Sequence, residues 1–123
     1  MRVYLSGPIT GKPDYNVAAF DAAAKRMRGE GHFVIIPHEL TPLFGTVEEI
    51  DNSFKAYYEG AAQTYPNGSY RLARAVMDAD LAAVHSCDVI YLLRGWENSR
   101  GAKKELAEAI KYGLKIMHEG AEK

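Results

Sequence analysis

The fold is decided by one stretch of sequence, DVIYLLRGWENSRGAKKELA at residues 88–107. Its apolar beginning, residues 88–93, predicts a buried strand, and its Ala- and Leu-rich end predicts a helix. The polar loop between them carries Gly95 and leads to Gly101 in the first turn of the helix. Open α/β sheets bind ligands at the carboxyl ends of their strands, where the N–H groups of a following helix attract anions. The stretch therefore predicts an α/β fold with a small-molecule site in this loop.

The rest of the chain repeats this alternation of strands and helices. Apolar periodicity predicts further strands at residues 2–6, 32–36 and 115–117, and helices at about 14–29, 47–62, 69–85 and 100–112. The first strand, the first helix and the second strand form a βαβ unit, whose strands are almost always parallel. We therefore expect one α/β domain over residues 1–123, a small Rossmann-like (flavodoxin-like), mostly parallel sheet of about four strands flanked by helices. The loops after the first and third strands should then meet at adjacent strand ends.

Residues 41–68 depart from this alternation, and we expect them to form a helical and loop insertion. The helix predicted at 47–62 is rich in aromatic residues, and Pro42, Gly45 and residues 66–68 predict loops on either side of it. Such a segment fits a lid or a subunit contact. It equally fits a helix whose aromatic side chains simply cover one edge of the sheet.

The composition excludes several classes of function. A formal net charge of −1 gives no electrostatic footprint for a nucleic acid polymer or an anionic membrane. Cys87 is the only cysteine, which excludes an intrachain disulfide and a cysteine metal cluster, and the four histidines form no HxH or HxxxH pair. The sequence shows no apolar run of the roughly 20 residues that a membrane span needs and neither a GxGxxG nor a Walker motif. Because the first residues turn polar quickly, we expect no signal peptide. We expect a cytoplasmic protein without a metal or another cofactor.

Two carboxylates stand close to faces that should be buried. Glu105 lies beside the apolar stripe of its helix, and Gly101, four residues earlier on the same face, leaves a bare patch above it. Asp80 lies only about 60° from the middle of the apolar stripe of the helix at 69–85. Spacing alone also fits plainer roles. Glu105 would then be a favourable charge in an early helical turn, and Asp80 a charge on a helix surface.

Polar loop residues are the other candidates for binding. In the loop after the first strand, two glycines let backbone N–H groups approach a ligand, and Ser6, Thr10 and Lys12 can hold a phosphate. A plain strand-to-helix turn is the alternative. In the loop after the third strand, Ser99 fits either a helix cap or a phosphate donor, and Trp96 either stacks on a flat ring or covers the sheet.

Two motifs together resemble the nucleoside 2-deoxyribosyltransferase-like superfamily. The first is YxSGPxTG at residues 4–11, and the second is GWxxSxGAxxE at residues 95–105. The pattern is most similar to that of a small branch of bacterial and phage proteins. The resemblance spans most of the chain, and the order of strands and helices agrees with it.

The resemblance implies roles for individual residues. It makes Glu105 the nucleophile that attacks C1′ of the sugar, Tyr4 the residue that orients this glutamate, and Asp80 an acid near the base and sugar. It also implies that first-loop residues and Ser99 hold a 5′-phosphate. The full set of substrate-binding residues that we predict is Ser6, Gly7, Pro8, Ile9, Thr10, Gly11, Asp88, Gly95, Trp96, Ser99 and Gly101.

The function that the resemblance implies is cleavage or transfer of the N-glycosidic bond of a deoxyribonucleoside or its 5′-monophosphate, through a glycosyl-enzyme intermediate. The chemistry requires an ionised Glu105, which an unperturbed pKa of about 4.3 allows, and a raised pKa for Asp80. The alternative is a non-catalytic module that binds or senses a nucleotide in the same crevice. A third possibility is that the aromatic segment 44–65 docks another protein. Since relatives are homo-oligomers, we expect a homodimer or a higher homo-oligomer.

Overall fold

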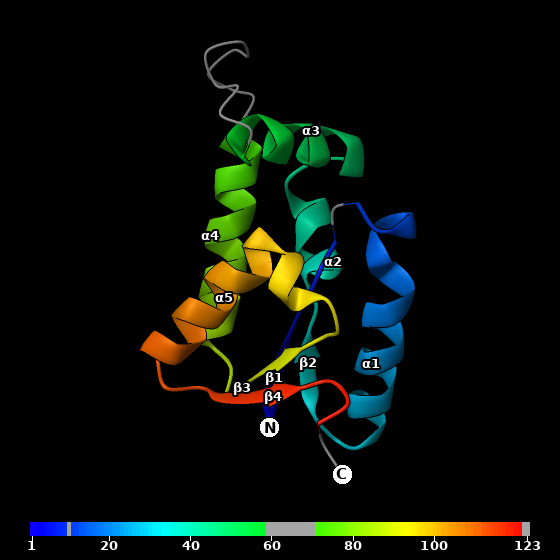
Figure 1. Ribbon diagram of the computed structural model, residues 1–123, viewed down its shortest axis with the longest axis vertical. Coiled ribbons are helices and arrows are strands. Elements are labelled where there is room, and N and C mark those ends of the chain that lie inside the picture. The colour runs from blue at the N-terminus through cyan, green and yellow to red at the C-terminus, as the bar shows by residue number, and fades with distance from the viewer. Residues whose placement is uncertain (10, 59–70, 122–123) are drawn as a thin grey trace.

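The computed structural model describes residues 1–9, 11–58 and 71–121. Its centre is a four-stranded sheet (Figure 1), built from β1 (Arg2–Ser6), β2 (Phe33–Ile35), β3 (Val89–Leu92) and β4 (Lys115–His118). The strands lie in the order β2-β1-β3-β4, and every neighbouring pair is parallel. The predicted fold class, a parallel α/β sheet of about four strands flanked by helices, is confirmed.

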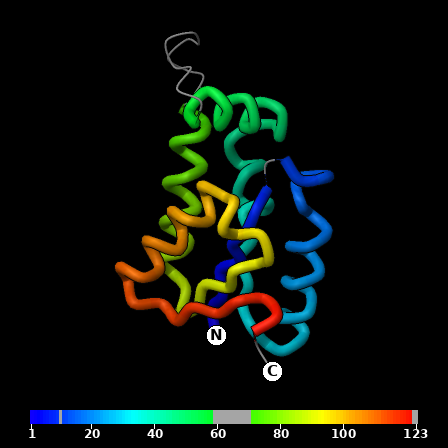
Figure 2. The backbone as a smooth tube through the Cα atoms, in the orientation of Figure 1, coloured from blue at the N-terminus to red at the C-terminus, as the bar shows by residue number. Residues whose placement is uncertain are grey.

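Helices cover both faces of this sheet. α1 (Val17–Gly29) packs on one face, and α4 (Arg71–His85) and α5 (Arg100–Lys111) pack on the other. β1 therefore runs through the middle of the molecule, between these two helical layers (Figure 2). α3 (Val47–Tyr58) crosses the end of α4 (Figure 1). Within the described residues, no helix has both the length and the apolar character needed to cross a bilayer.

Side chains of β1 alternate between the two faces of the sheet. Val3 and Leu5 join the core beneath α1, whereas Tyr4 joins the core beneath α4 and α5. Because side chains repeat with a period of two along a strand, Ser6 shares the face of Tyr4. All four side chains are buried, so β1 presents a tyrosine and a serine hydroxyl to the interior beside α5.

The segment between β2 and α3 is more helical than the sequence indicated. A short helix α2 (Pro37–Leu40) and a 3-10 turn η2 (Thr41–Leu43) occupy the region predicted as a loop around Pro42. Pro37 and Pro42 each lie in the first turn of their element, where a missing N–H costs no hydrogen bond. The parts of the predicted helices at 59–62 and 69–70 lie outside the described residues.

Helix α1 begins later than its apolar pattern indicates. Asp14, Tyr15 and Asn16 have φ angles of 49°, 53° and 62°, in the left-handed region. They belong to the preceding 3-10 element η1 (Pro13–Asn16), so the right-handed helix starts only at Val17.

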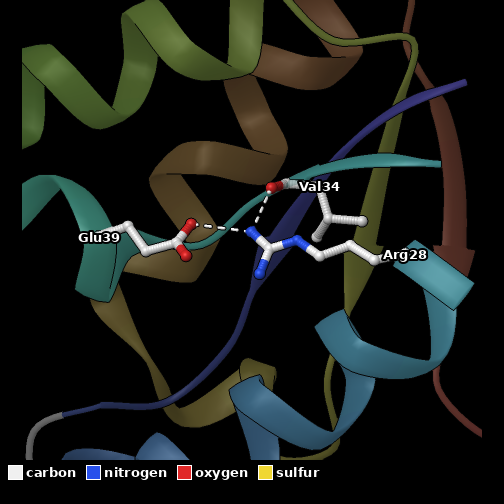
Figure 3. A network of polar contacts seen from close by, with 3 residues as sticks. All are labelled: Arg28, Val34 and Glu39. Carbon is white, nitrogen blue, oxygen red and sulfur yellow. Dashed lines mark hydrogen bonds and ion pairs between the residues drawn. The ribbon is translucent and has the colours of Figure 1, made fainter.

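The outer edge of the sheet at β2 is covered by a side chain of α1. Arg28 donates one hydrogen bond to the carbonyl oxygen of Val34 at 2.7 Å and another to Glu39 at 2.9 Å (Figure 3). The guanidinium thus satisfies a carbonyl of the edge strand and joins α1 to α2, a common protection against pairing with other chains.

The loops after β1 and β3 meet, as predicted. The amide of Leu93 donates to the carbonyl of Ser6 at 2.8 Å. A Cβ added at Gly7 would lie 2.9 Å from the Cβ of Leu93, so only glycine allows this approach. This contact brings the first loop beside the η4 turn (Trp96–Asn98) and the start of α5.

Candidate active site

A cavity of about 940 Å³ opens at the carboxyl ends of the central strands. The first loop, α3, α4 and the N-terminal half of α5 all contribute described residues to its wall. Its volume lies within the range of sites that enclose small molecules, roughly 300–1,000 Å³. The position agrees with the general rule that open α/β sheets bind ligands outside the carboxyl ends of their strands.

Glu105 lies in the wall of this cavity and is only 8% exposed. Its Oε2 accepts a hydrogen bond from the hydroxyl of Tyr4 at 2.9 Å, and its Oε1 accepts one from the hydroxyl of Ser6 at 2.6 Å. Helix α5 holds it there because Ser99 caps the helix, with its Oγ accepting from the amide of Ala102 at 3.1 Å. Since Tyr4 and Ser6 both belong to β1, both carboxylate oxygens of Glu105 are held by hydrogen bonds from this strand.

Asp80 lies in the same wall and is also 8% exposed. Its Oδ1 is buried and has no hydrogen-bond partner among the described residues. A buried carboxyl oxygen without a donor strongly favours the protonated form. Burial raises the pKa of Asp80 to about 8, and the charge of nearby Glu105 adds to the rise.

Glu105 is the member of the pair that ionises more readily. Burial raises its pKa to about 7, while the hydrogen bonds from Ser6 and Tyr4 lower the pKa and so favour the carboxylate. Burial and the neighbouring carboxylates raise the pKa of Tyr4 well above its usual value, so this phenol stays a donor. The pKa expected for Glu105 from sequence, an unperturbed one, is wrong because the side chain is desolvated. The raised pKa expected for Asp80 is found.

The apolar stripes of α4 and α5 lie slightly differently from the sequence-based expectation. In α4 the buried side chains include Ala73, Val76, Asp80 and Val84, and in α5 they are Ala102, Glu105 and Ala109. Asp80 and Glu105 therefore stand within the buried faces, not at their margins.

The first loop contributes some of its predicted residues to the cavity. Gly7, Pro8 and Ile9 line the wall. Ser6 is fully buried and bonded to Glu105, so the structure does not place it where a ligand would contact it directly. Gly11 is not part of the wall, and Thr10 lies outside the described residues.

In the loop after β3, too, only some of the predicted residues line the cavity. Ser99 and Gly101 line the cavity, and a Cβ at Gly101 would meet nothing closer than the Oγ of Ser99 at 4.0 Å, so the expected bare patch exists. Gly95 and Trp96 lie outside the described wall. The indole of Trp96 packs against the core beneath α4 and α5, 5.9 Å from the ring of His118, which matches the covering role.

The prediction for Asp88 needs correction. Its carboxylate accepts a hydrogen bond from the amide of Arg2 at 2.9 Å, at the beginning of β1 and β3. This is the amino edge of the parallel sheet, whereas the cavity lies at the carboxyl edge. Asp88 therefore helps to align the two strands and does not reach the site.

Sequence reasoning missed the side chains where α3 meets α5. The Nζ of Lys104 lies 5.0 Å from the ring centre of Tyr57, and the guanidinium of Arg100 lies 5.2 Å from that of Tyr58. All four residues line the cavity. The signal was the aromatic pattern of residues 47–58, which spacing alone could not direct toward a cavity.

His38 was also missed. It lines the cavity and donates from Nε2 to the carbonyl of Tyr15 at 2.9 Å, which holds the left-handed turn before α1. Across residues 1–9, 11–58 and 71–121, no three His, Cys, Asp or Glu side chains are grouped so as to hold a metal ion.

Comparison with known proteins adds a family and a fold. A family model described as "Domain of unknown function (DUF4406)" matches residues 1–118. Among solved structures, the fold is similar to that of a 2-deoxyribosyltransferase from the psychrotolerant bacterium Bacillus psychrosaccharolyticus, with a TM-score of 0.62 and 18% sequence identity. The match covers 96% of this chain and 71% of that one. That protein is described as a biocatalyst for the synthesis of nucleosides. No curated protein matches the sequence significantly.

Proposed function

The chain belongs to the DUF4406 family, and we propose that it cleaves or transfers the N-glycosidic bond of a deoxyribonucleoside or deoxyribonucleoside 5′-monophosphate. The observation that carries this proposal is the pair of buried carboxyl groups in one cavity, of which Glu105 accepts two hydrogen bonds and Asp80 has a buried oxygen that accepts none from the described residues. The fold likeness to a 2-deoxyribosyltransferase and the two sequence motifs support the choice of substrate class.

The arrangement suits a reaction that passes through an oxocarbenium-like state. A close anionic carboxylate stabilises positive charge at C1′ and can trap it as a covalent intermediate. The leaving base needs a proton, which a carboxyl group with a raised pKa supplies. In this proposal Glu105 is the nucleophile, Asp80 is the general acid, and Tyr4 positions Glu105.

The proposed reaction has two steps. A carboxylate oxygen of Glu105 forms a bond to C1′ while the C1′–N bond breaks, and the electron pair of that bond stays on the base nitrogen. The base leaves with the proton of Asp80. Water then attacks C1′ and gives its proton to the Asp80 carboxylate, and the bond between C1′ and Glu105 breaks. If a second base takes the place of water, the result is transfer instead of hydrolysis.

The test uses a panel of deoxyribonucleosides and their 5′-monophosphates, with chromatography for free base and for exchanged nucleoside. The wild-type protein should release or exchange a base. Glu105→Gln keeps the size of the side chain but removes the nucleophile, so the rate should fall by at least about a thousandfold. Circular dichroism should show an unchanged fold.

The matched control is Glu108→Gln, the same chemical change on the same helix. Glu108 bonds to His85 and is not part of the described cavity wall, so its variant should retain wild-type activity. An active Glu105→Gln variant would sink the proposed mechanism. Calorimetric binding of a nucleotide without base release over hours would instead identify the protein as a non-catalytic nucleotide-binding module.

A further inference from the structure

The hydroxyl of Ser6 donates to Glu105, in place of the ligand contact expected of a loop serine. Its Oγ lies 2.6 Å from Oε1 of Glu105, and the side chain is fully buried. The backbone of Ser6 is held equally firmly, because the residue pairs with Leu92 in the sheet and its carbonyl accepts from the amide of Leu93 at 2.8 Å. The donor is thus anchored to the central strand of the fold.

Ser6 and Tyr4 act on opposite oxygens of the same carboxylate. They are two residues apart on β1 and so project from the same face of the strand, toward α5. Tyr4 takes Oε2 and Ser6 takes Oε1. One donor alone would leave the carboxylate free to rotate about its last torsion, which is broad. Two donors on two oxygens set the plane of the group.

The hydrogen bond from Ser6 is important because of where Glu105 lies. Glu105 is buried and lies beside Asp80, a second carboxyl group in the same wall. An ionised carboxylate in such a place needs hydrogen bonds to replace the water that it has lost. Burial raises the pKa of Glu105, and Ser6 contributes the larger of the two hydrogen-bond effects that lower the pKa again.

We propose that Ser6 is a positioning residue that, together with Tyr4, keeps Glu105 ionised and in one orientation, and that it acts through Glu105 without touching the substrate. The inference rests on the proposed function for its catalytic consequence. The effect on Glu105 itself is independent of any activity, and it can be measured in the free protein.

The experiment compares Ser6→Ala with the wild-type protein in two measurements. NMR titration with side-chain ¹³C-labelled glutamate should show the pKa of Glu105 raised by about one to two units in the variant. In the base-release assay, the acidic limb of the pH profile should move up by the same amount. The loss of kcat should therefore be largest at low pH, tenfold or more, with KM nearly unchanged.

The matched control is Ser53→Ala, another buried serine, 2% exposed, whose Oγ accepts from the amide of Ala73 at 2.9 Å in α4. It should cost stability but leave the pKa of Glu105 and the pH profile where they are. If Ser6→Ala fails to fold, Ser6→Cys provides the same comparison, because a thiol is nearly as small and only a weak donor.

The outcomes separate this inference from the proposed function. An unchanged pKa of Glu105 in the Ser6 variants would overturn the inference, and so would a rise in KM without a shift of the pH profile. If the pKa rises but the wild-type protein releases no base from any substrate, the hydrogen-bond role of Ser6 stands and the proposed reaction fails.

Discussion

Replacing Asp80 with asparagine should make the protein more stable at pH 8 and leave its stability at pH 4 almost unchanged. Asparagine has nearly the same shape and is neutral at every pH, so it mimics the protonated acid. In the wild-type protein, Asp80 binds a proton more tightly when folded than when unfolded, because burial raises its pKa from 3.8 to about 8. Its contribution to stability is therefore complete below about pH 4 and is lost as the pH rises toward 8.

The gain in stability of Asp80→Asn depends on the difference between the pKa of Asp80 in the unfolded and in the folded protein. Each pH unit between the unfolded and folded pKa values lowers the free energy of unfolding by at most about 1.4 kcal/mol, which sets a ceiling of about 6 kcal/mol at pH 8. Structural relaxation and entry of water into the open cavity reduce this cost. We therefore expect Asp80→Asn to gain about 2–4 kcal/mol at pH 8 and less than about 1 kcal/mol at pH 4.

Urea unfolding followed by circular dichroism at pH 4, 6 and 8 measures both values. Asp21→Asn is the control, since this aspartate is exposed on α1 and the substitution should shift stability equally little at each pH. Glu105 is present in all three proteins, so the difference measures the burial of the Asp80 charge together with its repulsion of Glu105. An equal change in stability at pH 4 and pH 8, or a less stable variant at pH 8, would refute the reasoning.

Two further substitutions test the contacts around the cavity. Tyr4→Phe removes the donor to Oε2 of Glu105, so kcat for base release should fall about 10- to 100-fold with little change in KM, and undiminished kcat would show that this hydroxyl is dispensable. Gly7→Ala places a Cβ 2.9 Å from the Cβ of Leu93, so urea unfolding should show a loss of about 1–3 kcal/mol, and full stability would mean that the two loops separate easily.

The alternation of elements and the meeting of two loops were predictable because both depend on local patterns. The run at residues 89–92 carries no charged residue because β3 is buried on both faces, and helices are recognised by the period of their apolar residues. Parallel order follows from the connection by helices. Since parallel strands end at the same edge of the sheet, the loops after β1 and β3 were expected near each other, and their contact depends on the pairing of β1 with β3.

Other features could not be predicted because charged residues interrupt the apolar pattern of buried faces. Asp80 and Glu105 were placed at the margins of apolar stripes, since a charged residue is counted against burial. The prediction that Asp88 belongs to the site is wrong because Asp88 directly precedes β3 and so lies at the edge of the sheet opposite the cavity. The sequence could not show what the aromatic side chains of α3 contact. Helical spacing shows which residues share a face of the helix, but not which element packs against that face.

The class of fold follows from local patterns in the sequence, and those patterns also predict the edge of the sheet for a site and two candidate carboxylates, Glu105 and Asp80. The protonation of these two carboxylates depends on the tertiary structure. The hydrogen bonds to Glu105 come from residues 101 and 99 positions away in the chain, and the rise in the pKa of Asp80 comes from burial against elements distant in sequence. The protonation of a carboxyl group depends on its distances to other groups and on its loss of contact with water, and neither can be predicted from the local sequence.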